Sequence, residues 1–262
     1  MYRRLKVLVA ALALVFVLAA CNSEEASNLT DAEGVLKQSL EAMEGLNSYS
    51  MKMESEQTMT INDTEEITMF MTLDADMTLE PMAFYQKLSM ESDIPMMGAF
   101  ETEMYLVGDT VYVFEPMMDE WMELPMEYAE ELGGLAEMQL SPDQQLSMLR
   151  NFVDEIEMTE NSNEYILKVS GEGTDFMEIA QLFGGVGTEG FDDMLEIFSQ
   201  LDLNFVEYEI FIDKDTLYQT KLNMTMDMTM GMEGETVHTV QSMSATIKGY
   251  NEIDEIVLPE GL

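Results

Sequence analysis

The stretch Leu222-Asn-Met-Thr-Met-Asp-Met-Thr-Met-Gly-Met232 places a methionine at every second position, five times in succession. Successive side chains of a β-strand point to opposite faces of a sheet. The period of two therefore predicts a strand with one face of thioethers and one face of Thr and Asp. Thioethers are also ligands for soft metal ions such as Cu(I) and Ag(I). The stretch is thus either the apolar side of a sheet or a soft-metal site, and the rest of the chain must separate the two.

The same period of two recurs along much of the chain. Residues 51–61 and 67–79 alternate apolar with polar side chains on either side of a turn at Asn62-Asp63. Shorter or later segments with strand character follow at residues 84–90, 102–107, 110–114, 121–124, 165–170, 206–212, 218–232 and 237–248. Runs of strands that are joined without helices form antiparallel sheets, and long, curved sheets tend to roll into a barrel or half-barrel.

Helical spacing appears in four other places. Thr30 and Glu33 form a capping box in front of a helix that ends near Gly45. Ser141-Pro142 and Gln144 begin a second helix, and residues 174–183 and 191–201 are predicted to form two more. The expected fold is therefore α+β: a long curved antiparallel sheet, or half-barrel, with helices packed on one face or closing its mouth.

The N-terminus carries a sorting signal. Arg3, Arg4 and Lys6 precede an apolar run at residues 7–17 that is short for a membrane span, and Leu18-Ala-Ala-Cys21 follows. This pattern resembles the lipobox of bacterial lipoproteins. The resemblance implies that residues 1–20 are removed and that the Cys21 sulfur carries a diacylglycerol-type anchor with acyl chains such as palmitate. The alternative is an ordinary signal peptide with a chance cysteine.

The domain boundaries follow from this signal. Residues 1–20 are the expected lipoprotein signal peptide, residues 21–29 a polar lipidated tether, and residues 30–262 a single half-barrel domain. The anchor would hold the protein at the extracytoplasmic face of the cell membrane, and the protein would contact the membrane through this lipid. Cys21 is the single cysteine, so neither a disulfide nor a thiolate metal cage is expected.

The charge balance excludes one class of partner. The chain has 52 acidic and 11 basic residues and a net charge of −41. It therefore has no basic surface that would neutralise nucleic-acid phosphates. An acidic surface of this kind suits an exported protein in a saline or alkaline environment.

The order of elements resembles the LolA/LolB and LppX/LprG type of lipoprotein superfamily, and in particular a group of Gram-positive lipoproteins of unassigned function. The matching segments are Leu18–Cys21, Leu46-Asn-Ser-Tyr49, Phe211-Ile-Asp-Lys-Asp-Thr-Leu217, and Tyr250-Asn251 through Ile256-Val-Leu-Pro259. The resemblance implies a half-open barrel around an apolar cavity that accepts acyl chains. Likeness of fold does not by itself establish a function.

The sequence lacks the short motifs that are typical of several enzyme classes. There is no Gly-x-Ser-x-Gly, no phosphate-binding loop and no His-x-x-x-His, and Gly184-Gly-Val-Gly187 follows a helical segment. The single histidine, His238, is out of step with the apolar positions around it. We therefore expect a non-catalytic protein without a cofactor and without a dedicated metal site.

Methionine is unbranched and polarizable, and it suits surfaces that adapt to variable apolar shapes. We expect an apolar or lipid ligand in a cavity on the methionine side of the sheet. The alternatives are a Cu(I)- or Ag(I)-binding protein and a structural or partner-binding envelope lipoprotein, whose protein partner the sequence does not identify. The predicted lining residues are Met51, Met53, Met59, Met69, Met71, Leu73, Met77, Met224, Met226, Met228 and Met230.

Overall fold

The computed structural model describes residues 31–62, 64–93, 98–108, 110–125, 141–149, 155–172, 201–232 and 235–259. All of them belong to one compact unit, residues 31–262. Its elements, in chain order, are α2 (Ala32–Met43), β1 (Ser48–Ile61), β2 (Glu65–Leu79), β3 (Met82–Ser92), β4 (Phe100–Val107), β5 (Thr110–Glu115), β6 (Glu120–Pro125), α4 (Pro142–Leu149), β7 (Glu157–Glu160), β8 (Glu164–Gly171), β9 (Leu201–Asp213), β10 (Gln219–Met232) and β11 (Glu235–Lys248).

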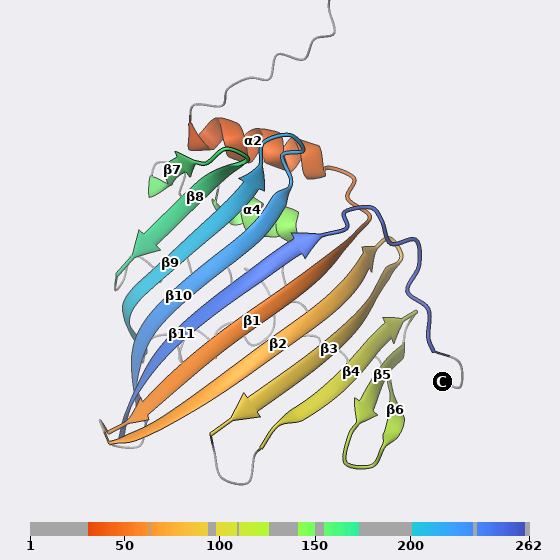
Figure 1. The fold of residues 1–262 in the computed structure, drawn as a ribbon, viewed down its shortest axis with the longest axis vertical. Helices are drawn as coiled ribbons and strands as arrows, with labels where there is room; N and C mark the ends of the chain where they lie inside the picture. The colour runs from red at the N-terminus through yellow and green to blue at the C-terminus, as the bar shows by residue number, and fades with distance from the viewer. Residues whose placement is uncertain are drawn as a thin grey trace, which may run out of the picture. The chain divides into compact units, whose positions relative to one another are not determined.

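The strands form one open antiparallel sheet, which Figure 1 shows as a curved layer. Its order is β6-β5-β4-β3-β2-β1-β11-β10-β9-β8-β7, so chain neighbours are sheet neighbours everywhere except at the centre. There the first strand, β1, pairs with the last, β11, from Ser50↔Lys248 to Ile61↔Val237. The strands β6 and β7 are the two edges, and the sheet does not close. The predicted α+β half-barrel is confirmed.

The register divides the side chains between two faces. Tyr49 pairs with Met77, Met51 with both Ala75 and Ile247, and so on along the strands. These five side chains are buried, and we call their side of the sheet the inner face. The residues between them in sequence form the outer face, which carries most of the charged and hydroxyl side chains of the central strands, for example the Lys52–Glu54 ion pair at 2.9 Å.

The outer face of the β3–β6 half carries aromatic side chains beside charged ones such as the Lys87–Glu101 ion pair at 2.8 Å. Tyr85, Tyr105, Trp121 and Phe114 lie in a row, with ring centroids 4.7, 5.6 and 5.4 Å apart in that order. Tilted aromatic contacts of this kind stabilise cross-strand pairs. They provide packing for a part of the sheet whose strands are short.

Helix α2 begins one residue later than the sequence predicted. Asp31, and not Thr30, is the N-cap, because its carboxylate accepts a hydrogen bond from the backbone N–H of Gly34 at 2.8 Å. Val35 and Leu36 are buried. The Ser39 hydroxyl donates to the carbonyl oxygen of Leu217 at 2.6 Å, which fastens the helix to the turn between β9 and β10.

Helix α4 begins as predicted. Pro142 is its first residue, and the Gln144 side chain accepts a hydrogen bond from the backbone N–H of Ser141 at 3.0 Å. Gln219, on the inner face of β10, donates to the Gln145 side chain at 2.9 Å. The helix therefore lies against the inner face. No helix in the described part of the chain is both long enough and apolar enough to span a membrane.

The structure corrects two sequence assignments near β9. Leu201, which was expected to end a helix, begins this strand, which starts before the predicted Val206. The reason is a bulge: Leu203 pairs with Met228 and Phe205 with Asp227, so Asn204 is an extra residue that breaks the period of two. The short strand β7 was not predicted. The rest of the predicted helices at 174–183 and 191–201 lies outside the described residues.

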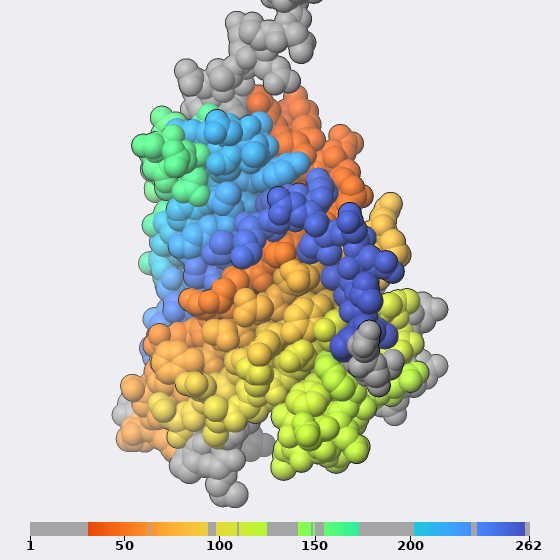
Figure 2. Space-filling view, turned by 45° about the vertical axis from the view of Figure 1, so that its right-hand side comes forward, coloured from red at the N-terminus to blue at the C-terminus, as the bar shows by residue number. Residues whose placement is uncertain are grey.

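The segment after β11 returns to the start of β1. Asn251 donates its backbone N–H to the carbonyl oxygen of Ser48 at 2.8 Å and accepts from the backbone N–H of Asn47 through its side chain at 2.7 Å. The Ile253 backbone N–H donates to the Ser48 hydroxyl at 3.1 Å. Figure 2 shows this segment in dark blue as it crosses the surface from β11 toward the yellow-green strands. These contacts reinforce the pairing of β1 with β11.

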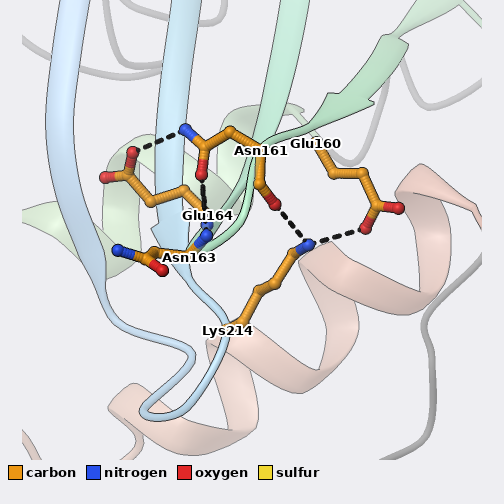
Figure 3. A network of polar contacts seen from close by, with 5 residues as sticks. All are labelled: Glu160, Asn161, Asn163, Glu164 and Lys214. Atoms are coloured by element: carbon orange, nitrogen blue, oxygen red, sulfur yellow. Dashed lines mark hydrogen bonds and ion pairs between the residues drawn. The ribbon is translucent and has the colours of Figure 1, made fainter.

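One lysine joins two turns at the β7–β10 side of the sheet (Figure 3). The Lys214 ammonium lies 2.8 Å from a carboxylate oxygen of Glu160 and donates to the carbonyl oxygen of Asn161 at 2.6 Å. Its backbone N–H donates to the carbonyl oxygen of Asn163 at 2.8 Å. The Asn161 side chain in turn accepts from the backbone N–H groups of Asn163 and Glu164, both at 2.8 Å. Lys214 thus connects the β7–β8 turn to the β9–β10 turn.

We expect Lys214→Met to lower the free energy of unfolding by about 1–2 kcal/mol, because the substitution removes a charge-assisted hydrogen bond made by a lysine whose side chain is only 24% exposed. Urea denaturation measures the change. The control is Lys37→Met on α2, whose ammonium lies 4.0 Å from Glu41 with both side chains exposed, and which should change stability by no more than about 0.5 kcal/mol. Equal effects of the two substitutions would contradict this role of Lys214.

Candidate functional site

All of the predicted lining residues lie on the inner face. In β1 and β2, Met51, Met53 and Met59 share the face of Tyr49, and Ile67, Met69 and Met71 continue the face of Met77. In β10, Leu222 pairs with Ala245 of the inner face, and the alternate residues that follow it keep the same side. The side chains that the register brings to this one surface are Met51, Met53, Met59, Met69, Met71, Leu73, Met77, Met224, Met226, Met228 and Met230.

Burial changes along this face. Near α2 and α4 the side chains are packed: Met77 and Leu73 are each 3% exposed, and Met51 is also buried. Toward the β1–β2 turn, Met59 and Met69 are half-buried, as are Met226 and Met228 on β10. The inner face therefore has a packed end, which acts as core, and a less covered end that is rich in methionine.

The less covered end contains a polar group that the sequence analysis missed. Ser55 and Gln57 of β1 and Thr239 and Gln241 of β11 all point to the inner face. Gln57 lies directly opposite Gln241, whose side-chain amide donates to the Ser55 hydroxyl at 3.3 Å. We call these four residues the polar island.

Methionines surround the polar island, both on its own strands β1 and β11 and on the neighbouring strands β2 and β10. The cross-strand partners of its members, taken from the register, are Met59, Met69, Met71, Met226, Met228 and Met243. Met243 and Met90, which lies opposite Met71, were not among the predicted lining residues. The signal for the island is present in the sequence as two polar residues, Ser55 and Gln57, at positions where the alternation calls for apolar ones.

The geometry bears on the soft-metal alternative. Methionines two apart along β10 have a spacing of roughly 6.5–7 Å, whereas Met224 lies directly opposite Met243, where Cβ atoms approach to about 4.5–5.5 Å. His238 is on the outer face, where its ring nitrogen lies 2.9 Å from the Asp227 carboxylate. Among the described residues, no group of three or more His, Cys, Asp or Glu side chains is placed to hold a metal ion.

A hollow of about 280 Å³ lies over β9–β11, and most of the side chains that line it belong to the outer face. Several of those side chains have polar partners: Glu207 pairs with Lys168 at 2.7 Å, and Asn223 donates to Glu209 at 3.2 Å and accepts from Ser244 at 3.0 Å. The hollow is therefore lined mainly by polar side chains, unlike the methionine-rich surface. Its lining residues are Glu207, Glu209, Asn223, Met224, Thr225, Ser242, Met243 and Ser244.

Three tyrosines have phenols with raised pKa values: Tyr49 is buried, and Tyr208 and Tyr250 are half-buried. Burial, followed by the charge of Asp143, raises the pKa of Tyr49 to about 12. Burial likewise raises the pKa of Tyr208 to about 12. The Tyr250 hydroxyl donates to the carbonyl oxygen of Gln219, and burial is again the main cause that raises its pKa. Among the described residues, the buried side-chain oxygen of Gln219 has no hydrogen-bond partner, and an oxygen left in this state costs about 1–3 kcal/mol.

An open antiparallel half-barrel with one polar and one methionine-rich face is the class of protein that this geometry defines. The chain belongs to a family of unknown function (DUF6612), whose model matches residues 31–262. No curated protein matches it.

Several solved structures are similar to the chain. LprF from Mycobacterium bovis is 14% identical, with 87% of this chain and 95% of that chain covered and a TM-score of 0.40. A LolA superfamily protein from Nitrosomonas europaea is 10% identical, with coverages of 88% and 96% and a TM-score of 0.23. A β-barrel-like protein of a domain of unknown function from Brucella abortus is 10% identical, with coverages of 78% and 99% and a TM-score of 0.24. The LolA superfamily, which the sequence resembles, is thus among these similarities.

The raised pKa of Tyr49 predicts how the free energy of unfolding changes with pH. Between pH 10 and pH 12 the unfolded chain loses the phenolic proton while the folded chain keeps it, so stability is complete below pH 10 and falls as the pH rises. The free energy of unfolding should decrease by about 1.4 kcal/mol per pH unit for this residue. Urea denaturation at several pH values should give a shallower decrease for Tyr49→Phe, and an unchanged slope would exclude Tyr49 as a cause.

Proposed function

We propose that this protein is a non-catalytic lipoprotein, anchored by Cys21 to the extracytoplasmic face of the cell membrane, whose inner sheet face binds an apolar or lipid ligand. One observation supports this function above all others: the thioethers gather on a single face and are only half-buried where the polar island lies. A face meant only as core would be packed along its whole length.

The chemistry of methionine suits this role. Each thioether side chain is flexible and polarizable, so a surface of many methionines adapts to a ligand without one fixed shape. Pockets for small molecules are mostly apolar with few polar groups that orient the ligand. The less covered end of the inner face has this composition, with Met59, Met69 and Met226 around the amides of Gln57 and Gln241.

The anchor and the charge fit the same function. A two-chain anchor at Cys21 gives stable attachment where one acyl chain gives marginal binding. The net charge of −41 repels the anionic lipid surface. In this arrangement the acidic body stands off the membrane on its tether, and the ligand is held by apolar contacts rather than by charge.

Soft-metal binding is the second candidate, and the Met224–Met243 pair favours it, because two thioethers face each other directly across neighbouring strands. Such a site would hold one Ag(I) or Cu(I) per pair. Titration with Ag(I), followed by native mass spectrometry of wild type and of Met224→Leu/Met243→Leu, tests it. Stoichiometric binding that the double substitution abolishes, together with no binding of an apolar probe, would replace the lipid proposal by a metal one.

The lipid proposal is tested with the neutral fluorescent probe N-phenyl-1-naphthylamine and unlipidated protein that begins after Cys21. Wild type should bind the probe, and lipid released from it by organic extraction should be detectable by mass spectrometry. Met226→Lys should weaken probe binding at least about tenfold, because the substitution places a charge on the apolar inner face.

Thr225→Lys is the matched control. It introduces the same side chain at the adjacent position, which is exposed on the outer face opposite Glu207, and should leave the probe affinity unchanged. Far-UV circular dichroism and urea denaturation establish that both variants are folded. Absence of probe binding in wild type, or equal loss in both variants, would rule out the inner face as the binding surface.

A further inference from the structure

The polar island is the feature of the inner face that a purely apolar ligand leaves unexplained. Ser55 is 8% exposed and Thr239 is 6% exposed, while Gln57 and Gln241 are half-buried. Amides and hydroxyls that are removed from water without a hydrogen-bond partner cost free energy. A surface that only packs against aliphatic groups would be more stable with apolar residues at these positions.

The island has a defined place. It occupies β1 and β11, the two central strands of the sheet, and methionines border it on both sides: Met69 and Met71 on β2, and Met226 and Met228 on β10. Neighbouring strands are about 4.8 Å apart, so the two groups of methionine stand roughly 14 Å apart across the sheet. The apolar regions therefore flank a central polar one.

Resting on the proposed function, we propose that the polar island binds the ester or amide linkage of a neutral lipid whose apolar chains extend from that linkage over the methionines on both sides. Glutamine amides and serine or threonine hydroxyls both donate and accept hydrogen bonds. They therefore match a linkage whose carbonyl oxygen accepts, and whose N–H or neighbouring hydroxyl donates.

The charges around the island favour a neutral ligand. In the described strands, the cross-strand neighbours of its four residues are all methionines or members of the island itself, and none of them is charged. A carboxylate or phosphate placed there would lose its hydration without gaining a cation. The net charge of −41 acts against an anionic ligand as well.

The test compares ligands of equal length in displacing N-phenyl-1-naphthylamine. Decyl decanoate carries an ester between two apolar chains, heneicosane is an alkane of the same length, and heneicosanoate is an anion of that length. Wild type should bind the ester about tenfold more tightly than the alkane, which corresponds to one or two net hydrogen bonds, and heneicosanoate should be the weakest. Gln57→Met/Gln241→Met, which extends the methionine surface over the island, should remove this preference and leave the alkane affinity equal or higher.

The control is Thr58→Met/Ser242→Met, which makes the same kind of change one residue along the same two strands, on the outer face. It should keep the preference for the ester. If wild type binds the probe but does not distinguish ester from alkane, or prefers heneicosanoate, the island is not the linkage site while the proposed function stands. If wild type binds neither probe nor ligand, the proposed function itself fails.

Discussion

The pairing of β1 with β11 is the constraint on which the rest of the structure depends. It joins the first and last strands of the domain in a register that runs without interruption from Ser50↔Lys248 to Ile61↔Val237. A slip of one residue would turn every side chain of one strand to the opposite face. Met51 and Met53 would then meet the outer face, and Lys52 and Glu54 the packed inner face. Asn251 and Ile253, which bond to the start of β1, help to exclude such a slip.

This pairing also creates the candidate site. The polar island takes two residues from β1 and two from β11, so it exists only when these strands pair. The hydrogen bond from Gln241 to Ser55 crosses this central pairing. The methionine groups on β2 and β10 are far apart in sequence and become the two borders of the island through the same register. The two ends of the inner face differ in composition. Aromatic and aliphatic side chains such as Tyr49 and Ile247 pack near the helices, and methionine is the main apolar residue where the packing is looser.

Much of the fold was predictable because alternation is a local property. The strands β1, β2, β10 and β11, the turn at Asn62 and the start of α4 at Pro142 all follow from residues close in sequence. The predicted boundaries were wrong where the alternation is interrupted, and where two neighbouring residues could both serve as the helix cap. The bulge at Asn204 hides the beginning of β9, and Asp31 competes with Thr30 as the cap of α2 because both side chains accept hydrogen bonds. The four residues of β7 are too few to show a period.

By itself, the sequence determined that the thioethers share one side of a strand and that His238 points away from them, because the direction of a side chain in a strand depends only on whether its position is odd or even. The tertiary structure decided which strands are neighbours, where the methionines are packed and where they are half-buried, and that Gln57 meets Gln241. The physical reason is that cross-strand contacts join residues separated by most of the chain, and alternation within a strand carries no information about which strand will pair with it.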